Sequence, residues 1–139
     1  MNILIVEARY HPAVTDALVD GATAALEKGG ARFERLAVPG VLELPAAVAI
    51  AARSERPFDG YIALGSVLRF STVPEVLYRE AVRGLVELGT QGLAIGNGIV
   101  FENNEGSALD LATSHDVGGD AARACLALIT FGQRQGILR

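Results

Sequence analysis

Residues 2–38, NILIVEARYHPAVTDALVDGATAALEKGGARFERLAV, contain the pattern that decides the fold of this chain. The unbroken apolar run from Ile3 to Val6 is typical of a buried parallel strand. Pro12 suits the first turn of a helix, and apolar residues then follow helical spacing until Gly29-Gly30 ends the segment. Arg32 to Val38 alternates as a second strand. This stretch therefore predicts a strand–helix–strand unit with parallel strands.

The rest of the chain continues the alternation of short apolar runs and amphipathic stretches. Two further strands are expected, at Tyr61 to Leu64 and Leu93 to Ile95. Further helices are expected from near Pro45 to Arg53, from Pro74, from Glu105 to Ala112 and from near Gly119-Asp120. Right-handed crossovers between four such strands predict the α/β class, as a three-layer αβα sandwich with a four-stranded parallel sheet.

Ligands of such sheets collect beyond the carboxyl ends of the strands. We expect those ends to be the loops at Glu7 to His11, Val38 to Leu44, Gly65 to Val73 and Gly96 to Asn104. Any functional site is therefore expected where these four loops meet.

Length and composition limit the possible functions. The 139 residues predict one domain, residues 1–139, with a sizeable core. Half of the residues are hydrophobic and 20% are charged, which excludes disorder and suggests more apolar surface than a lone small domain can hide. We therefore expect a homo-oligomer. The net charge of −4 has the wrong sign for a nucleic-acid or anionic-membrane surface, so neither partner is expected.

Cysteine usage and the start of the chain indicate a cytoplasmic protein. Cys125 is the only cysteine, so no disulfide framework or cysteine-based metal site forms within the chain, and a reducing compartment fits. No apolar run approaches the roughly 20 residues that span a bilayer. Met1 leads directly into the first strand without a basic leader.

The sequence offers no established cofactor or metal motif. Gly96-Asn97-Gly98 invites comparison with a dinucleotide-binding loop, but Phe101 occupies the place of the third glycine and the turn follows the last expected strand. A phosphate-binding P-loop is absent, since the only lysine, Lys28, sits at a helix end. His11 and His115 lack cysteines or carboxylates at metal-ligand spacing. None of these patterns by itself indicates a nucleotide or metal site.

Several residues near the expected strand ends are candidates for a site. Glu43 is an isolated carboxylate in an apolar run, so it must pair, cap the following helix or meet a polar ligand. His11 is either a solvated or capping histidine or a titratable group of the site. Arg69 is placed to bridge to a carboxylate or to meet an anion. Ser71 and Thr72 precede a helix start, where they either cap the helix or bind an anion.

Motifs at these loops occur in a recognisable order. Ala8-Arg9-Tyr10-His11 looks like a Ser-Arg-Phe-Asn loop, and residues 38–45, VPGVLELP, are similar to Val-Pro-Gly-Ala/Ser-aromatic-Glu-Leu-Pro. Ala63 to Arg69 looks like a Leu-Gly-x-Val-Ile-Arg strand end, and Ile95 to Asn104 like a variant Ile-Gly-Asn-Gly-Ile loop ending in Glu-Asn. Residues 118–122 match the start of a last helix. Over nearly its whole length the chain resembles the lumazine synthase family.

This resemblance implies a flavodoxin-like, single lumazine synthase-like domain and a transferase of riboflavin biosynthesis. The implied reaction condenses 5-amino-6-ribitylaminouracil with 3,4-dihydroxybutanone 4-phosphate to give 6,7-dimethyl-8-ribityllumazine, phosphate and water, without an organic cofactor or metal. Family members assemble as pentamers, some packed further into icosahedral shells, with each site shared between neighbouring subunits. The chain is accordingly expected to be a homopentamer or a multiple of five.

The same resemblance suggests roles for individual residues. Tyr10 stands for a ring-facing phenylalanine and Thr72 for a phosphate-side threonine. The expected substrate-binding residues are Tyr10, Val41, Leu42, Glu43, Ser71, Thr72 and Gly98, with backbone contacts at Val41, Leu42 and Gly98. The catalytic candidates are His11, as a substitute base, and Arg69.

The chain departs from the family pattern where the chemistry is expected. After its arginine the family's third loop continues as Gly-x-Thr-x-His-Phe, with a proton-transferring histidine, whereas residues 70–75 read FSTVPE. Leu42 replaces the aromatic residue before the glutamate. Leu111 and Val117 occupy the places of a phosphate-binding arginine and a lysine. Two interpretations follow: a weak or unusually built lumazine synthase with a divergent active site, or a catalytically silent paralogue that keeps the oligomeric scaffold or binds a flavin-like ligand.

Overall fold

Four parallel strands form the central sheet of the computed structural model, which describes residues 1–70 and 72–137. In spatial order they are β2 (Arg32–Val38), β1 (Asn2–Ala8), β3 (Gly60–Leu68) and β4 (Ile95–Glu102). The strand β3 is buried along its whole length because β1 and β4 flank it and helices cover both of its faces. The strand β2, at one edge of the sheet, is largely exposed. The predicted four-stranded parallel sheet is confirmed.

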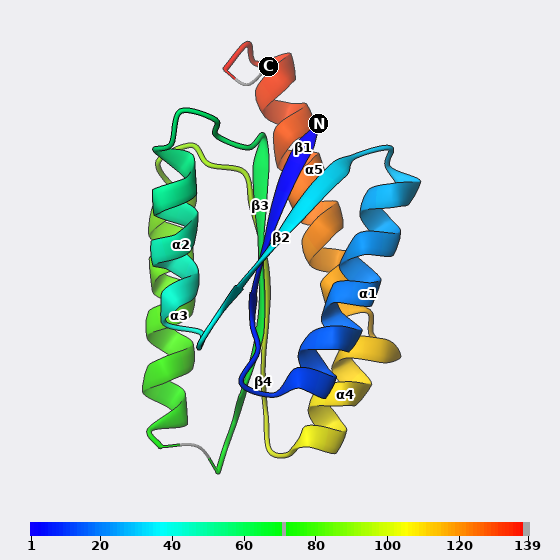
Figure 1. The fold of residues 1–139 in the computed structure, drawn as a ribbon, viewed down its shortest axis with the longest axis vertical. Helices are drawn as coiled ribbons and strands as arrows, with labels where there is room; N and C mark the ends of the chain where they lie inside the picture. The colour runs from blue at the N-terminus through cyan, green and yellow to red at the C-terminus, as the bar shows by residue number, and fades with distance from the viewer. Residues whose placement is uncertain (71, 138–139) are drawn as a thin grey trace.

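Helices lie on both sides of this sheet, which makes the molecule a three-layer αβα sandwich, as predicted (Figure 1). One face carries α1 (Pro12–Lys28), α4 (Glu105–Thr113) and α5 (Val117–Arg134). The other face carries α2 (Glu43–Ala52) and α3 (Pro74–Gly89). Successive side chains of a strand point to opposite faces, so Ile62 belongs to the apolar cluster under α1 and α5, while Tyr61 belongs to the cluster under α2 and α3.

The last strand corrects one prediction. The sequence predicts a strand at Leu93 to Ile95 and a turn at Gly96-Asn97-Gly98, but the three turn residues lie inside β4. The reason is close packing rather than chain reversal: a Cβ atom on Gly96 would collide with the carbonyl oxygen of Ala121 in α5. Glycine inside a strand often marks such a close approach of another backbone.

Other boundaries differ by less. The strand expected at Tyr61 to Leu64 extends through Leu68, so the residues after Gly65 that the sequence assigns to a loop are largely strand. The helix expected near Pro45 begins at Glu43, and the last helix begins at Val117. No helix within residues 1–70 and 72–137 is long and apolar enough to cross a bilayer.

Candidate active site

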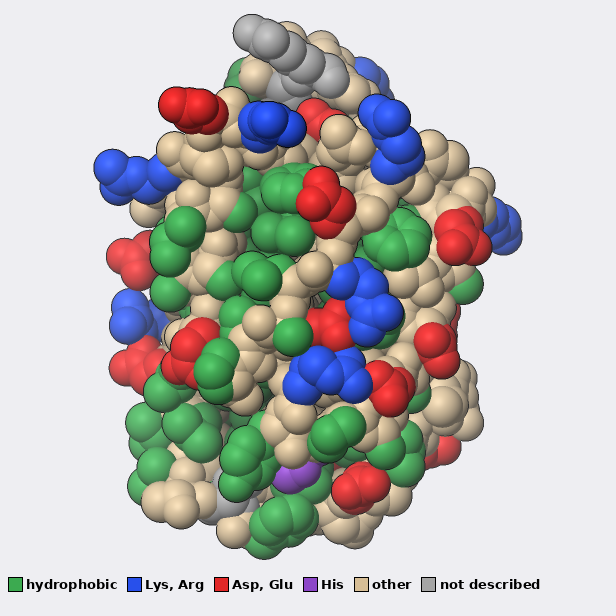
Figure 2. Space-filling model, in the orientation of Figure 1, with side chains coloured by type: hydrophobic (Ala, Val, Ile, Leu, Met, Phe, Trp, Pro, Cys, Tyr) green, Lys and Arg blue, Asp and Glu red, His purple; other side chains and the backbone are tan. Residues whose placement is uncertain are grey.

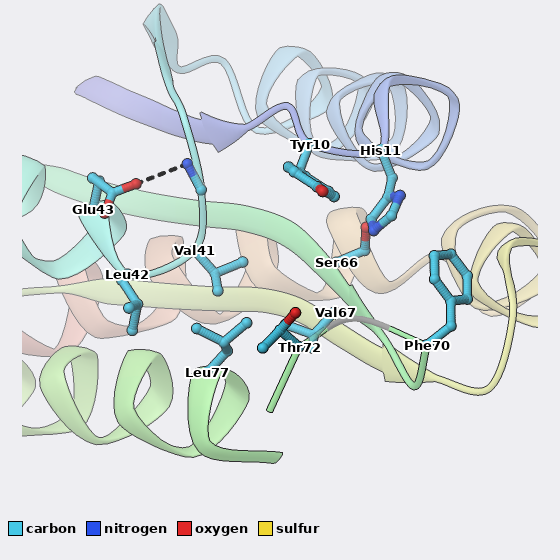
Figure 3. Close-up of a pocket in the computed structure, with 11 residues that line it drawn as sticks. Tyr10, His11, Val41, Leu42, Glu43, Ser66, Val67, Phe70, Thr72 and Leu77 are labelled. Atoms are coloured by element: carbon cyan, nitrogen blue, oxygen red, sulfur yellow. Dashed lines mark hydrogen bonds between the residues drawn. The ribbon is translucent and has the colours of Figure 1, made fainter. Parts of the chain in front are cut away.

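A cavity of about 400 Å³ opens at the carboxyl ends of the strands, where the sequence predicts ligands to bind (Figure 3). Its lining combines aliphatic side chains, three rings, hydroxyls and one carboxylate. The lining residues are Tyr10, His11, Gly40, Val41, Leu42, Glu43, Ser66, Val67, Phe70, Thr72 and Leu77. The structure therefore brings together six of the residues singled out from the sequence: Tyr10, His11, Val41, Leu42, Glu43 and Thr72.

The carboxylate of Glu43 holds the turn that precedes its own helix. Its Oε1 atom accepts a hydrogen bond from the backbone N–H of Gly40 at 2.9 Å, and Glu43 is the first residue of α2 (Figure 3). The negative charge also suits the positive end of the helix dipole. No described residue donates to Oε2, so this oxygen is available to a ligand in the cavity.

Two exposed aromatic rings flank His11 at the mouth of the cavity. The ring of Tyr10 lies edge-on at a centroid distance of 5.0 Å, and that of Phe70 at 6.0 Å. Both Tyr10 and Phe70 are 72% exposed, so they offer aromatic surface that the described chain does not cover. Burial lowers the pKa of His11, partly opposed by the charge of Glu105, so the imidazole stays neutral over a wider pH range and can accept a proton.

Between β3 and α3, the described residues that line the cavity are Phe70 and Thr72, and neither carries a titratable side chain. Val73, directly before α3, adopts a left-handed conformation with φ 44° and ψ 55°. This conformation is costly for a β-branched residue. Pro74 then begins the helix, as the sequence predicts. Ser71 lies outside the described residues.

Arg69 lies at the end of β3 and pairs with a carboxylate, one of the two alternatives that the sequence leaves open. Its Nε donates to Oδ1 of Asn103 at 2.5 Å, and its Nη1 lies 3.3 Å from Oε1 of Glu75. The guanidinium also lies 4.6 Å from the ring centroid of Phe101. Arg69 thus ties β3 to α3 and to the end of β4, and it is not one of the cavity's lining residues. A catalytic role for Arg69 stays a prediction.

Gly98 is also placed away from the cavity lining. It lies within β4, where a Cβ atom would press against the side chains of Leu64 and Ala121. The absence of a side chain at this position therefore serves helix–sheet packing. Its predicted substrate contact stays a prediction.

Basic side chains are missing from the cavity as described: none of the lining residues is Lys or Arg. Leu111 and Val117, where the resemblance predicts an arginine and a lysine in related chains, pack against the apolar cluster between the sheet and α1, α4 and α5. Within the described ranges, no group of three or more His, Cys, Asp or Glu side chains could hold a metal ion. An anion in this cavity is left with side-chain hydroxyls and backbone N–H groups.

Sequence reasoning missed a buried carboxylate behind this edge of the sheet. Glu7 is 2% exposed, and its carboxylate accepts hydrogen bonds from Arg9 at 2.6 Å and from Arg35 at 2.7 and 2.8 Å. Burial by itself raises the pKa of Glu7, but hydrogen bonds and charges of Arg35 and Arg9 outweigh it, so the pKa is lowered. An acidic residue directly following an apolar strand run, with arginines on the next strand, is the signal that could have revealed it.

The fold and the cavity define an α/β protein with a cavity at the carboxyl edge of a parallel sheet, the place where such sheets bind small ligands. The family model for 6,7-dimethyl-8-ribityllumazine synthase matches residues 1–133. The 6,7-dimethyl-8-ribityllumazine synthase of Sphingopyxis alaskensis is 48% identical over 139 residues, covering 98% of each chain. That of Novosphingobium aromaticivorans is 46% identical, covering 96% of this chain and 97% of the relative. The chain belongs to the 6,7-dimethyl-8-ribityllumazine synthase family, as the resemblance predicts.

Proposed function

We propose that this chain condenses 5-amino-6-ribitylaminouracil with 3,4-dihydroxybutanone 4-phosphate to form 6,7-dimethyl-8-ribityllumazine, and that it does so slowly. The observation that carries the proposal is the family match along the chain, to which the cavity at the carboxyl edge lends support. The slow rate follows from the third loop, which presents Thr72 but no proton-transferring side chain to the cavity.

In this proposal the site works chiefly by holding the pyrimidine. The ring of Tyr10 faces the heteroaromatic ring, and Oε2 of Glu43 accepts hydrogen bonds from ribityl hydroxyls. Val41 and Leu42, in the same loop, supply apolar surface and backbone groups. Holding two reactants in place converts a bimolecular step into an effectively unimolecular one, which can account for roughly 7–11 kcal/mol of barrier lowering.

Proton transfer falls to His11 in this proposal. It is the only imidazole that lines the described cavity, and burial keeps it neutral and able to act as a base. A positioned acid or base typically contributes about 10²- to 10⁴-fold in rate. Because the pKa of His11 is lowered, the rate should fall only when the pH drops through that lowered value. Arg69 is a positioning residue in this proposal. Its hydrogen bonds to Asn103, after β4, and to Glu75, in α3, hold the two ends of the segment that carries Thr72.

A second copy of the chain is proposed to complete the site within a homopentamer or a multiple of five. Large apolar side chains are exposed on α2 and α3, among them Ile50 at 73%, Val76 at 58% and Val86 at 58%. Figure 2 shows apolar side chains gathering over the side of the molecule formed by these helices. The edge strand β2 also leaves Leu36 exposed. We place this single-domain protein in the cytoplasm, where its free cysteine would stay reduced.

A single-turnover assay with both substrates tests the activity. Product absorbance should rise faster than in an uncatalysed control, and the His11→Ala variant should lose most of the difference. Wild-type turnover typical of the family with an unaffected His11→Ala variant would overturn the account of the site. Sedimentation at micromolar concentration tests the assembly, and a stable monomer of 14.5 kDa would contradict it.

One observation favours a second candidate, a catalytically silent paralogue that binds a flavin or lumazine. The resemblance predicts two basic residues at positions 111 and 117, but the chain has Leu111 and Val117 there, and both pack against the apolar core. No Lys or Arg side chain therefore lines the described cavity to bind a phosphorylated substrate. A turnover rate equal to the uncatalysed control, together with measurable riboflavin or lumazine binding, would favour this candidate.

A further inference from the structure

The short segment between β1 and α1, residues 9–11, carries two of the rings at the cavity. Tyr10 and His11 both line the cavity, and Figure 3 shows their side chains extending from this segment toward it. Tyr10 is 72% exposed, and its ring contacts the ring of His11 edge-on. Packing within the chain therefore holds Tyr10 only weakly, so the direction of its ring depends on how the backbone of this segment is held.

One residue of α1 fixes both ends of the segment. Oγ1 of Thr15 donates to the carbonyl oxygen of Ala8 at 2.7 Å, and the backbone N–H of Thr15 donates to the carbonyl oxygen of His11 at 3.1 Å. Between these ends, the N–H of Arg9 donates to the carbonyl oxygen of Val38 at 3.4 Å, which is longer than the usual range of about 2.7–3.2 Å. The middle of the segment therefore depends on a further anchor.

The side chain of Arg9 supplies that anchor. Its Nη1 donates to Oε1 of Glu7 at 2.6 Å, and its Nη2 donates to Oδ1 of Asp16 in α1 at 2.5 Å. Glu7 is 2% exposed and also accepts hydrogen bonds from Arg35 of β2 at 2.7 and 2.8 Å. A planar guanidinium that is bound through two nitrogen atoms has a fixed orientation, which a single flexible contact would not give. The bridge thus joins the residue directly before Tyr10 to both β1 and α1.

We propose that Arg9 is a positioning residue, whose bridge between Glu7 and Asp16 fixes the backbone that presents Tyr10 and His11 to the cavity. The inference rests on the proposed function, in which these two rings face the pyrimidine and accept a proton. Arg9 is not one of the residues that line the described cavity, so it acts through its neighbours and not on the substrate. The buried carboxylate of Glu7 then serves the site as well as the stability of the fold.

Steady-state kinetics of Arg9→Gln test the proposal. Glutamine cannot bridge two carboxylates, so the KM for the pyrimidine should rise and kcat should fall. The expected loss in kcat/KM is roughly 10- to 100-fold, because a misplacement of about 1 Å can cost about 100-fold. Arg9→Lys keeps the charge but not the fork of donors, and should recover only part of the loss. Asp16→Asn removes an exposed carboxylate at little cost in stability, and should lie between wild type and Arg9→Gln.

Arg123→Gln is the matched control. Arg123 of α5 also bridges two carboxylates, Asp116 at 3.0 Å and Asp120 at 2.7 Å, and it does not line the described cavity. This variant should keep the kcat and the KM of wild type. A substitution that only reduced the amount of folded protein would lower the apparent kcat and leave KM unchanged. Unchanged KM in Arg9→Gln, or full recovery of activity in Arg9→Lys, would overturn the proposal.

Titration of the His11 imidazole by NMR gives a readout that needs no turnover. Its signal can be assigned with His11→Ala, since the chain has two histidines. Burial lowers the pKa of His11, against the charge of Glu105 in α4, so a loosened segment that exposes the ring should raise this pKa toward its ordinary value in Arg9→Gln. Arg35→Gln removes a charge beside the same Glu7 but leaves the segment anchored, and should raise it less.

The titration also separates this proposal from the proposed function. An unmoved His11 pKa in Arg9→Gln, or an equal rise in Arg35→Gln, would overturn the positioning role of Arg9. Wild-type turnover equal to the uncatalysed control, with the His11 pKa still raised in Arg9→Gln alone, would reject the proposed function and support the positioning role.

Discussion

Replacing Glu7 with glutamine is expected to destabilise the protein by about 2–3 kcal/mol at neutral pH. Glu7 accepts three hydrogen bonds from Arg9 and Arg35 while its side chain is 3% exposed. Removing one partner of a fully buried ion pair costs about 3–5 kcal/mol. The side chains of Arg9 and Arg35 are 31% and 48% exposed, so both guanidiniums regain water when the charge is removed, which places the expected cost below that range.

Urea unfolding at one fixed protein concentration measures this change, since the stability of an oligomer depends on concentration. Glu80→Gln is the matched control. It removes an equally short ion pair, Glu80 to Arg83 at 2.5 Å, but both side chains are about half or more exposed, so the expected cost is at most about 0.5 kcal/mol. Equal stability of Glu7→Gln and Glu80→Gln would refute the reasoning.

The same variant has a predicted pH dependence. The folded-state pKa of Glu7 lies below its ordinary value because the interactions with Arg35 and Arg9 outweigh burial. Its contribution to stability is therefore complete above the ordinary carboxyl pKa and is lost as the pH falls through the lowered value. The stability gap between wild type and Glu7→Gln should shrink on acidification. A gap that widened toward acid pH would contradict the lowered pKa.

Three further variants test the site. Glu43→Gln should weaken binding of a ribityl-pyrimidine in calorimetry, because an amide replaces the carboxylate that is proposed to accept hydrogen bonds from ribityl hydroxyls; unchanged affinity would mean that the carboxylate serves only the turn, through its bond to the N–H of Gly40. Leu111→Arg should tighten inorganic phosphate binding by roughly 1.5–3 kcal/mol at most, measured by titration of the oligomer, and no change would mean that this position does not line the site. Val73→Gly should raise the melting temperature, since glycine relieves a left-handed conformation that costs a β-branched residue about 1–3 kcal/mol; a lower melting temperature would show that Val73 is not strained.

The fold was predictable where local signals and packing agree. Arg32 to Val38 is a strand with the predicted bounds, and Pro74 begins a helix as its fixed φ angle favours. The glycines at 96 and 98 were assigned to a turn because closely spaced glycines usually mark turns, whereas here Gly98 makes room chiefly for Leu64 of β3 and Gly96 makes room for α5. That contact joins residues far apart in the sequence, so no local pattern could have revealed it.

The site was predictable only in part, for a similar reason. Tyr10 and Glu43 follow from motifs within single loops, and the structure places both at the cavity. Ser66 was assigned to a loop, so its burial within β3 could not be inferred. The contacts of Arg69 with Asn103 and Glu75 could not be inferred, because only the folded chain brings these residues to its guanidinium.

The types of residue that line this cavity bear on how the reaction would proceed. Tyr10 and Glu43, the residues proposed to hold a ribityl-pyrimidine, line the cavity, whereas the lining residues proposed to move protons or bind phosphate are His11 and Thr72. Losing an acid–base group lowers the rate by about 10²- to 10⁴-fold, which corresponds to roughly 3–5 kcal/mol of activation free energy. Positioning can lower the barrier by more, roughly 7–11 kcal/mol. Near-ordinary affinity for the pyrimidine combined with slow turnover is therefore the signature that this geometry predicts. Weak affinity with slow turnover would instead mean that positioning has been lost as well.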